Sequence, residues 1–253
     1  MRIDRYDKTL AHLKVNGKAA LNELAAINKV STDTIRRDLL DMEAKGLVRR
    51  VRGGVVICED DPGKKSFGIR SVLHHDEKME LCGSLKELIT DGQTIALNNG
   101  TTNIEAVKFL CENYNRLNII TNSLALIALL LENRKFNVIV PGGILDMQEK
   151  SLYGSRCEQD IRSYNIDIAL LAVNAISLKK GITDFRFNEV GVINAMLESA
   201  DKKYALVDSS KFETVSCINL CSLDAVDGFL TDKNLHEDTV KRYERLGYKL
   251  YIN

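Results

Sequence analysis

Hydroxyl and guanidinium side chains meet in one short segment near the start of the chain, Ser31-Thr32-Asp33-Thr34-Ile35-Arg36-Arg37-Asp38. Small hydroxyl residues can approach a phosphate oxygen or a base edge closely. The forked donors of Arg36 and Arg37 match the acceptors of guanine or phosphate. Taken alone, two adjacent arginines are more typical of a solvated helix face. The surrounding elements must therefore decide between DNA recognition and an ordinary surface.

Apolar spacing predicts three short helices around this segment. A first helix over residues 5–14 ends at Asn16-Gly17, and a second begins near Ala19. The third runs from an N-cap at Ser31 to Gly46, with its apolar face repeating at helical intervals. In a helix-turn-helix, the second helix of the pair enters the major groove with its N-terminal residues toward the base edges. The segment described above takes that place.

A hairpin, or wing, is predicted over residues 47–57, because two β-prone stretches flank Gly53-Gly54. Residues 1–57 thus predict a winged helix-turn-helix domain, with the helix-turn-helix itself at about 20–44, that binds double-stranded operator DNA. We expect the DNA contacts from eight hydroxyl and arginine residues of this domain: Ser31, Thr32, Thr34, Arg36, Arg37, Arg49, Arg50 and Arg52.

The distribution of charge agrees with a polyanionic partner for this domain. The chain of 253 residues has no net formal charge, but residues 1–57 carry a net charge of +5 and the remainder −5. The six cysteines are scattered without metal-ligand spacing, so we expect neither a metal nor a cofactor. No charged start followed by an apolar stretch opens the chain, so we expect no signal peptide, and its longest apolar runs are too short for a membrane span. We therefore expect a cytoplasmic protein without membrane contact.

A second domain follows a linker. Residues 58–75 include the turn pair Pro62-Gly63 and have little to bury, which is typical of a linker. From residue 76 to residue 253, apolar strands alternate with helical patterns, which predicts an α/β domain with a largely parallel, covered sheet. The expected strands are 94–97, 118–121, 137–140, 166–173, 204–207 and 228–231.

Small polar residues follow successive strands of this predicted sheet. The loop Asn98-Asn99-Gly100-Thr101-Thr102 runs from a strand into a helix, where backbone N–H groups and hydroxyls suit an anion. Ligands of open α/β sheets bind at the carboxyl ends of the strands. We expect effector binding at that edge from the residues Asn98, Asn99, Gly100, Thr101, Thr102, Thr121, Asn122, Ser123, Gly142, Gly143, Gly154 and Lys211.

Both halves of the chain resemble one known family. Residues 5–57, with Val30–Leu39 and Arg52-Gly53-Gly54, look like the DNA-binding domain of the DeoR family. The polar loops, in their order, resemble the DeoR-type sensor domain, which is similar in fold to ribose 5-phosphate isomerase and is associated with sugar phosphates as effectors. The resemblance implies a repressor of carbohydrate-metabolism genes. It would act as a homodimer or homotetramer on repeated half-sites and be released by a phosphorylated sugar.

Three positions depart from the family pattern, which usually has Asp at the place of Asn98, Gly at the place of Ala175 and a lysine near Ile193. An Asp-to-Asn exchange removes a negative charge and any general base but keeps hydrogen-bonding capacity. A binding protein therefore tolerates this exchange better than a catalyst does.

Two alternatives stay open at this stage. An enzyme would need a carboxylate near the ligand, and Asp184 and Glu189 lie after the strand that ends at Val173. Taken alone, these two residues are more typical of a charge at the start of a helix and of a solvated side chain. No hydrolase elbow, Walker loop or dinucleotide fingerprint is present, so we expect no catalysis. A scaffold protein that uses its second domain only to dimerise is the third class.

Overall fold

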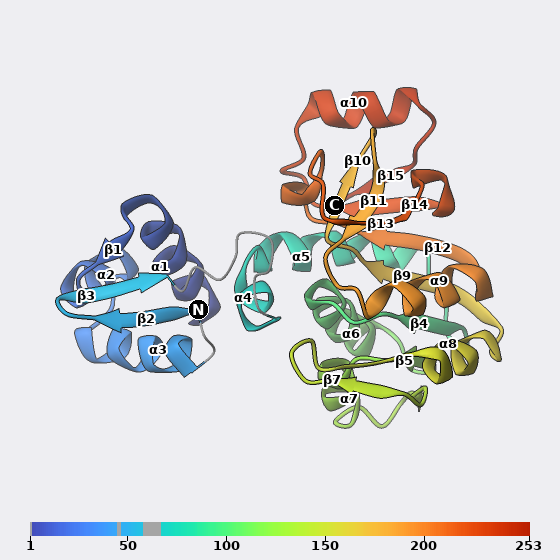
Figure 1. Ribbon diagram of the computed structural model, residues 1–253, viewed down its shortest axis with the longest axis horizontal. Helices are drawn as coiled ribbons and strands as arrows, with labels where there is room; N and C mark the ends of the chain where they lie inside the picture. Colours follow the sequence, from blue (N-terminus) through green and yellow to red (C-terminus); the bar gives the residue numbers. More distant parts are fainter. Residues whose placement is uncertain (1, 45–46, 58–66) are drawn as a thin grey trace. The chain divides into compact units, whose positions relative to one another are not determined.

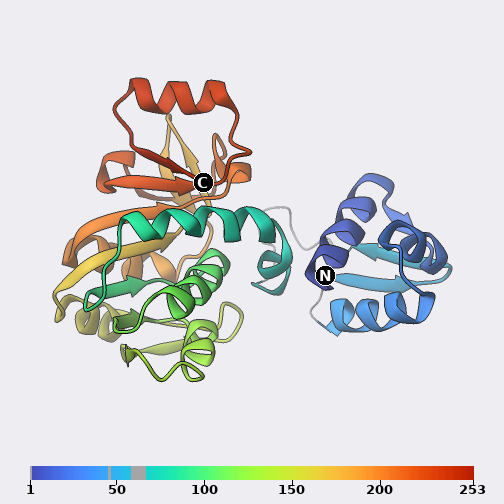
Figure 2. The same ribbon diagram turned by 180° about the vertical axis from the view of Figure 1, so that it is seen from behind.

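The structure is a computed structural model that describes residues 2–44, 47–57 and 67–253, and it divides into two compact units, Met1–His75 and Asp76–Asn253 (Figures 1 and 2). Of the expected linker, residues 58–66 lie outside the described residues. Its later part forms helix α4, Phe67–Val72. Val72 and Leu73 are buried in the core of the smaller unit, so this part of the expected linker contributes to a folded core.

Besides α4, the described part of the smaller unit has three further helices and a three-stranded antiparallel sheet of order β1-β3-β2. Its elements are α1 (Arg2–Asn16), β1 (Lys18–Ala19), α2 (Leu21–Asn28), α3 (Thr32–Ala44), β2 (Val48–Val51) and β3 (Gly54–Ile57). Leu10, Leu24, Ile35 and Leu39 lie in one buried core, which is why the helical faces read from the sequence come together. The predicted helix-turn-helix and wing are both present. Gly46, the predicted end of the third helix, lies outside the described residues.

The wing turns one residue earlier than the Gly53-Gly54 pair suggested. Val51 pairs with Gly54, so Arg52 and Gly53 form the turn, and Gly53 has a φ of 80° that favours glycine. Gly54 already belongs to β3. A Cβ there would lie 2.4 Å from the carbonyl oxygen of Ala19, so glycine allows β1 and β3 to pair closely.

A seven-stranded sheet of order β15-β14-β12-β9-β4-β5-β6 forms the centre of the larger unit, and every neighbouring pair is parallel. In Figure 1, β12, β9, β4 and β5 follow one another through the middle of this unit. The strands are β4 (Thr94–Leu97), β5 (Asn118–Thr121), β6 (Asn137–Ile139), β9 (Ile166–Ala172), β12 (Ala200–Leu206), β14 (Gly228–Thr231) and β15 (Leu250–Ile252). The predicted α/β architecture with a parallel sheet is confirmed.

Helices cover both faces of this sheet because its strands are apolar on both sides. Ile95 and Leu97 of β4 pack with α6 and α7 in one core, whereas Ala96 packs with α8 and α9 in the other. The helical elements are α5 (His75–Leu81), η1 (Cys82–Glu87), α6 (Thr101–Asn113), α7 (Leu124–Leu130), α8 (Ser155–Arg162), α9 (Glu189–Ser199), η2 (Ser209–Lys211), η3 (Leu223–Ala225) and α10 (Glu237–Arg245). In the described part of the chain, no helix is long and apolar enough to cross a membrane.

Two small antiparallel sheets were not predicted. They are the hairpin β7 (Ile144–Asp146) and β8 (Ser151–Tyr153), and the sheet of β10 (Ala175–Ser177), β11 (Gly181–Asp184) and β13 (Ile218–Cys221). The hairpin is attached to the end of β5, where Ser123 bridges Ser151 and the Leu152 N–H donates to the Asn122 carbonyl at 2.8 Å. This attachment places the hairpin over the loops predicted to bind an effector.

Candidate DNA-recognition surface and effector site

Helix α3 begins as its sequence predicts. The Ser31 hydroxyl accepts the Thr34 N–H at 3.2 Å, which is an N-cap bond. Ile35 and Leu39 are buried on one side of the helix, while Arg36 and Arg37 are exposed on the other. The structure thus places the two arginines on the outer face of the predicted recognition helix.

A charged contact that sequence reasoning missed fixes α3 to α1. The Arg5 guanidinium donates to both carboxylate oxygens of buried Asp38, at 2.6 and 3.1 Å, and the Tyr6 hydroxyl donates to Asp41 at 2.5 Å. Bidentate arginine–carboxylate pairs restrict orientation as well as distance. Asp38 therefore holds the recognition helix in place from its buried side.

The arginines of the surface differ in their partners. Arg36 forms an ion pair with Asp33 at 2.5 Å, and Arg50 forms one with Glu43 at 2.7 Å. Arg36 and Arg50 also line one groove of about 440 Å³ between α2, α3 and the wing. The remaining predicted DNA contacts lie on the same two elements: Ser31, Thr32, Thr34 and Arg37 at α3, and Arg49 and Arg52 at the wing, with all three arginines exposed.

In the larger unit, the structure brings the polar loops after β4 and β5 together in one buried cluster. The Ser123 hydroxyl donates to Asn99 Oδ1 at 2.8 Å, which joins the two loops directly. Thr121 Oγ1 accepts the Ser123 N–H at 3.2 Å. Asn99, Asn122 and Ser123 have no exposed surface. The hairpin β7–β8 accounts for this burial, since Asn99 donates to the Glu149 carbonyl at 3.1 Å and Asn122 to the Leu152 carbonyl at 2.9 Å.

The amino terminus of α6 lies in the same cluster. Its cap residue is Gly100, and no side chain of the described residues caps this end of the helix. A Cβ on Gly100 would lie 2.3 Å from the Cβ of Ala172, so glycine lets the loop pack against the end of β9. Thr101 and Thr102 are buried, and the Thr102 hydroxyl has no hydrogen-bond partner among the described residues. Free N–H groups and an unpaired hydroxyl are what an anion requires.

Asn98 has a different environment from the one expected of an effector contact. Its amide accepts the Ala172 N–H at 2.8 Å and donates to the Asn99 and Ala172 carbonyls at 3.2 and 3.1 Å. It also accepts from Asn103 at 3.1 Å, so the side chain ties β4 to β9. An aspartate could not make the two donations, because an ionised carboxylate only accepts. This gives the departure from the family pattern a physical reason.

Arg186 and Asp184 form a buried ion pair that sequence reasoning did not assign to the site. The guanidinium donates to Asp184 at 2.9 and 2.5 Å, to the Ala172 carbonyl at 3.0 Å, and to the Asn99 carbonyl. Burial favours a raised pKa for Asp184, but the facing guanidinium holds it below its usual value. Strand order reverses between β4 and β9, where open α/β sheets bind ligands, and Arg186 occupies that point.

Glu189, at the start of α9, is the second buried carboxyl of the site. Its burial raises the pKa to about 7, although the Arg186 guanidinium and hydrogen bonds act in the opposite direction. Asn122 donates to Glu189 Oε1 at 3.0 Å. The interpretation of Glu189 as a solvated residue is therefore wrong. The acidic residues considered for an enzyme are both buried, but Asp184 is fully engaged by Arg186.

The other predicted effector residues lie around this cluster and not within it. Lys211 donates to the Val173 carbonyl at 3.2 Å and forms an ion pair with Asp208 at 3.3 Å, beside the end of β9. Gly142 is exposed and donates its N–H to Asp160 of α8 at 2.9 Å. Gly143 packs against Tyr153 and Cys157, and Gly154 caps α8. Among the other departures from the family pattern, Ala175 lies in β10, and Ile193 belongs to α9 and is buried in the core.

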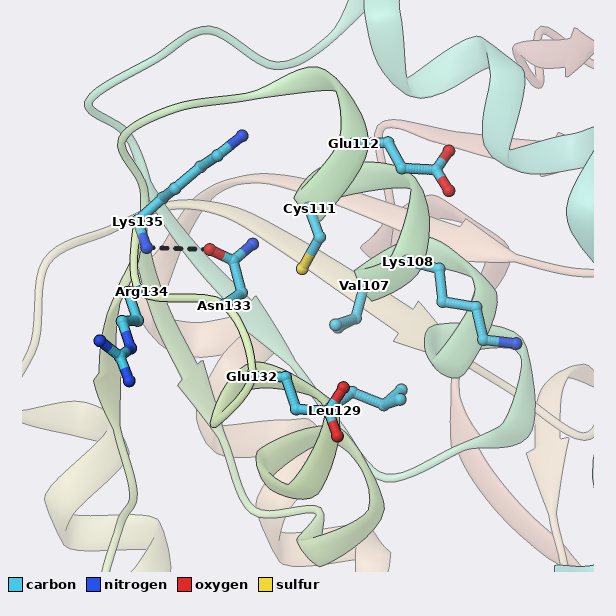
Figure 3. Close-up of a pocket in the computed structure, with 9 residues that line it drawn as sticks. All are labelled: Val107, Lys108, Cys111, Glu112, Leu129, Glu132, Asn133, Arg134 and Lys135. Carbon is cyan, nitrogen blue, oxygen red and sulfur yellow. Dashed lines mark hydrogen bonds between the residues drawn. The ribbon is translucent and has the colours of Figure 1, made fainter.

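A separate pocket of about 430 Å³ lies between the carboxyl-terminal parts of α6 and α7 (Figure 3). Cys111 and Leu129 point into it, and the Lys135 N–H donates to Asn133 Oδ1 at 2.9 Å. Cys111 is ten residues along α6 from Thr101, which places this pocket about 15 Å from the amino terminus of the helix. Its cations and carboxylates are mixed, so it lacks the anion-binding character of the strand-end cluster.

These features define the class of protein. A winged helix-turn-helix with arginines on its recognition helix, joined in one chain to an α/β unit with a buried polar site at its strand ends, is a DNA-binding transcription regulator. The family comparison is specific. The DeoR-like helix-turn-helix domain matches residues 5–61 and the DeoR C terminal sensor domain matches residues 73–233. The chain belongs to the DeoR family.

Individual relatives extend over nearly the whole chain. It is 28% identical to a putative aga operon transcriptional repressor of Escherichia coli O157:H7, over 98% of this chain and 93% of that protein. It is 28% identical to the glycerol-3-phosphate regulon repressor of Escherichia coli K12, over 90% of each. Among solved structures, ribose 5-phosphate isomerase from Methanocaldococcus jannaschii matches with a TM-score of 0.40 and 16% identity, over 55% of this chain and 54% of that chain.

Proposed function

We propose that this regulator represses carbohydrate-metabolism genes and that a phosphorylated sugar weakens its binding to operator DNA. The amino terminus of α6 carries the proposal, because it presents uncapped N–H groups beside the unpaired Thr102 hydroxyl at the carboxyl edge of a parallel sheet. The names of the relatives support it, since one is described as a glycerol-3-phosphate regulon repressor.

On the DNA side, we propose that α3 enters the major groove and that the wing contacts the phosphate backbone. Arg36 and Arg37 are the expected base-reading residues, with Ser31, Thr32 and Thr34 at the start of the helix. Arg49, Arg50 and Arg52 lie on the wing. Because helix-turn-helix proteins read repeated half-sites as symmetric assemblies, the working unit is a homodimer or homotetramer acting on cytoplasmic DNA.

In the larger unit, the phosphate group would be held by Gly100, Thr101 and Thr102 at the start of α6. Lys211 would supply positive charge near the end of β9. Asn98 and Asn99 shape the loop, and the remaining predicted residues complete or border the site: Thr121, Asn122, Ser123, Gly142, Gly143 and Gly154. We assign no catalytic step, because Arg186 neutralises Asp184 and Asn98 has no ionisable group.

Fluorescence anisotropy tests both halves of the proposal. DNA from upstream of the protein's own gene and of its neighbours is titrated with protein at fixed salt, with and without a panel of sugar phosphates. We expect specific binding that one compound weakens. Specific binding that no compound alters would overturn the effector role, and the absence of specific binding to any of these fragments would overturn the proposed operator.

A further inference from the structure

The point where strand order reverses, between β4 and β9, is already filled by the chain itself. Arg186 and Asn98 donate to the same two carbonyl groups there, those of Asn99 and Ala172. Each carbonyl oxygen has two lone pairs, so the two donors satisfy both acceptors completely. Asp184 takes up the rest of the guanidinium edge in a bidentate pair. A ligand group at this point would have to displace a buried ion pair.

Unused hydrogen-bonding capacity lies one strand away, at the end of β5. Three buried atoms there have no hydrogen-bond partner among the described residues: Asn122 Oδ1, Ser151 Oγ and Glu189 Oε2. Asn122 and Ser151 have no exposed surface, and Glu189 is 1% exposed. The three side chains are neighbours, because Asn122 donates to Glu189 Oε1 at 3.0 Å and the Leu152 N–H, next to Ser151, donates to the Asn122 carbonyl at 2.8 Å. The Ser151 hydroxyl faces the Glu189 carboxyl and lowers its pKa through a weak hydrogen-bonding interaction that lacks the geometry of a full hydrogen bond.

The chemistry of these atoms selects the group that would satisfy them. An amide oxygen and a carboxylate oxygen are acceptors, and a serine hydroxyl both donates and accepts. A phosphate oxygen would face two acceptors and is excluded on this ground. A hydroxyl group donates to the carboxylate and accepts from its protonated form, so it suits both states of Glu189. Two adjacent hydroxyl groups of one ligand would provide hydrogen-bond partners for all three atoms.

We propose that Asn122, Ser151 and Glu189 form a subsite for adjacent hydroxyl groups of the effector, one strand from the point that Arg186 fills. The inference rests on the proposed function and deepens it, because it assigns the two ends of a sugar phosphate to different places. The phosphate lies at the start of α6, and the hydroxyl-bearing carbons lie beneath the hairpin β7–β8. Ser151 belongs to that hairpin, so the hairpin contributes directly to ligand recognition.

A variant pair isolates this subsite. Ser151→Ala removes a hydroxyl without a well-formed hydrogen bond, so the ligand-free protein loses only the weak interaction of this hydroxyl with the Glu189 carboxyl. Thr231→Val is the matched control, because Thr231 Oγ1 is equally buried and unpartnered but lies at the end of β14. Four strand positions separate β14 from β5, which amounts to about 19 Å. Ser151→Cys fills the same space with a weaker hydrogen-bonding group and serves as a second variant if alanine disturbs folding.

The full chain is titrated calorimetrically with inorganic phosphate, glucose 6-phosphate, fructose 6-phosphate and ribose 5-phosphate. We expect Ser151→Ala to bind the best of the three sugar phosphates roughly three- to tenfold more weakly than the parent. The affinity of Ser151→Ala for inorganic phosphate should equal that of the parent. Thr231→Val should bind both inorganic phosphate and the sugar phosphate as tightly as the parent does. Monodeoxy analogues sharpen the test: the hydroxyl group whose removal weakens binding to the parent should have no further effect in Ser151→Ala.

The outcomes separate the two proposals. A parent protein that binds none of the sugar phosphates overturns the effector role and this subsite with it. A parent that binds one of them, with Ser151→Ala and Ser151→Cys unchanged in affinity, overturns the subsite and leaves the effector role standing. If Ser151→Ala lost affinity for inorganic phosphate and for the sugar phosphate by the same factor, the subsite would also be overturned. The loss would then come from the phosphate end of the ligand.

Discussion

Glu189 shows how a single buried group makes folding depend on pH. Its carboxyl has a pKa of about 7 in the folded chain against an ordinary value of 4.5, and burial is the largest cause. Between these two values the folded protein keeps a proton that the unfolded chain releases. The free energy of unfolding therefore falls as the pH rises from about 4.5 to 7, and the full penalty is present above pH 7.

We predict that Glu189→Gln is more stable than the parent at pH 8, by on the order of 3 kcal/mol, and nearly equal to it at pH 4.5. The amide keeps the size of the side chain and an acceptor for Asn122. Urea unfolding at several pH values measures the difference, and Glu132→Gln, on the surface, is the control. A stability difference that does not grow between pH 5 and pH 7 would contradict the assignment of the raised pKa.

Arg36 and Arg37 are adjacent, but their surroundings differ. Arg36 is paired with Asp33, whereas no salt bridge joins Arg37 to another of the described residues. We predict that Arg37→Ala weakens specific operator binding by about 1 to 3 kcal/mol if Arg37 reads a base. Anisotropy titrations at several salt concentrations distinguish the possibilities. Weakening on all sequences, with a salt slope reduced by about one, would mean that Arg37 contacts phosphate instead.

Residue-scale prediction from the sequence succeeded where the signal is local. The cap at Ser31 is readable because the hydroxyl and the N–H that it accepts are three residues apart. Arg186 and Ser151 could not be assigned to the site in this way. Arg186 bonds to carbonyls of Asn99 and Ala172, and backbone carbonyls leave no signature in a sequence. Ser151 reaches the site through a bridge to Ser123, which is set by the position of the hairpin.

At the scale of elements, most strands of the central sheet were predicted to within one residue, because parallel strands covered on both faces are continuous apolar runs. Strand β12 was predicted only from residue 204 although it begins at Ala200, and β15 was not predicted. The strands at 94–97, 118–121 and 228–231 agree with β4, β5 and β14 at both ends. The hairpin β7–β8 was missed because Ile144 and Leu145 face outward and each strand has only three residues. The helical pattern that follows residue 76 is α-helical only to Leu81, and Gly83 and Ser84, which are weak helix formers, lie in the 3-10 segment η1.

The contact between the start of α6 and the end of β9 offers a sharp test of this packing. Gly100 has extended backbone geometry that any residue adopts, so only space forbids a side chain there. A Cβ would lie 2.3 Å from the Cβ of Ala172. We predict that Gly100→Ala lowers the free energy of unfolding by about 1 to 3 kcal/mol and weakens effector binding, because the loop must shift.

Removing the opposing methyl group should restore the fit. We expect the double variant Gly100→Ala/Ala172→Gly to have a higher free energy of unfolding than the summed effects of the two single changes predict. The reason is that Ala172→Gly removes the methyl group with which the added Cβ collides. Thermal unfolding of the four proteins in this cycle measures the coupling. Additive effects would show that the clash with Ala172 does not limit the position.

At the scale of the whole molecule, the two units carry opposite net charges, +5 over residues 1–57 and −5 over the rest. The basic part attracts DNA, whereas the acidic part disfavours nonspecific contact with it. An anionic effector must therefore bind to a unit of like net charge, which it can do only where local donors outweigh the general repulsion. The uncapped start of α6 and Lys211 provide such donors, which is why the proposed phosphate position lies there.

Coupling between the two ligands is reciprocal, because the free energies around the closed cycle of free, singly bound and doubly bound protein sum to zero. An effector that weakens operator binding by a given factor must itself bind more weakly to the DNA-bound protein by the same factor. We predict equal factors for the parent when sugar-phosphate affinity is measured with and without saturating operator DNA. Thr101→Ala and Lys211→Ala should bind the effector more weakly, and their affinity for operator DNA in the absence of effector should equal that of the parent. These variants alter effector binding and not the equilibrium between the DNA-competent and incompetent states. The coupling factor at saturating effector should therefore equal that of the parent. Because a closed thermodynamic cycle permits no difference, unequal factors in the parent would contradict a simple two-site coupling and would mean that subunits dissociate or further molecules bind during one of the titrations.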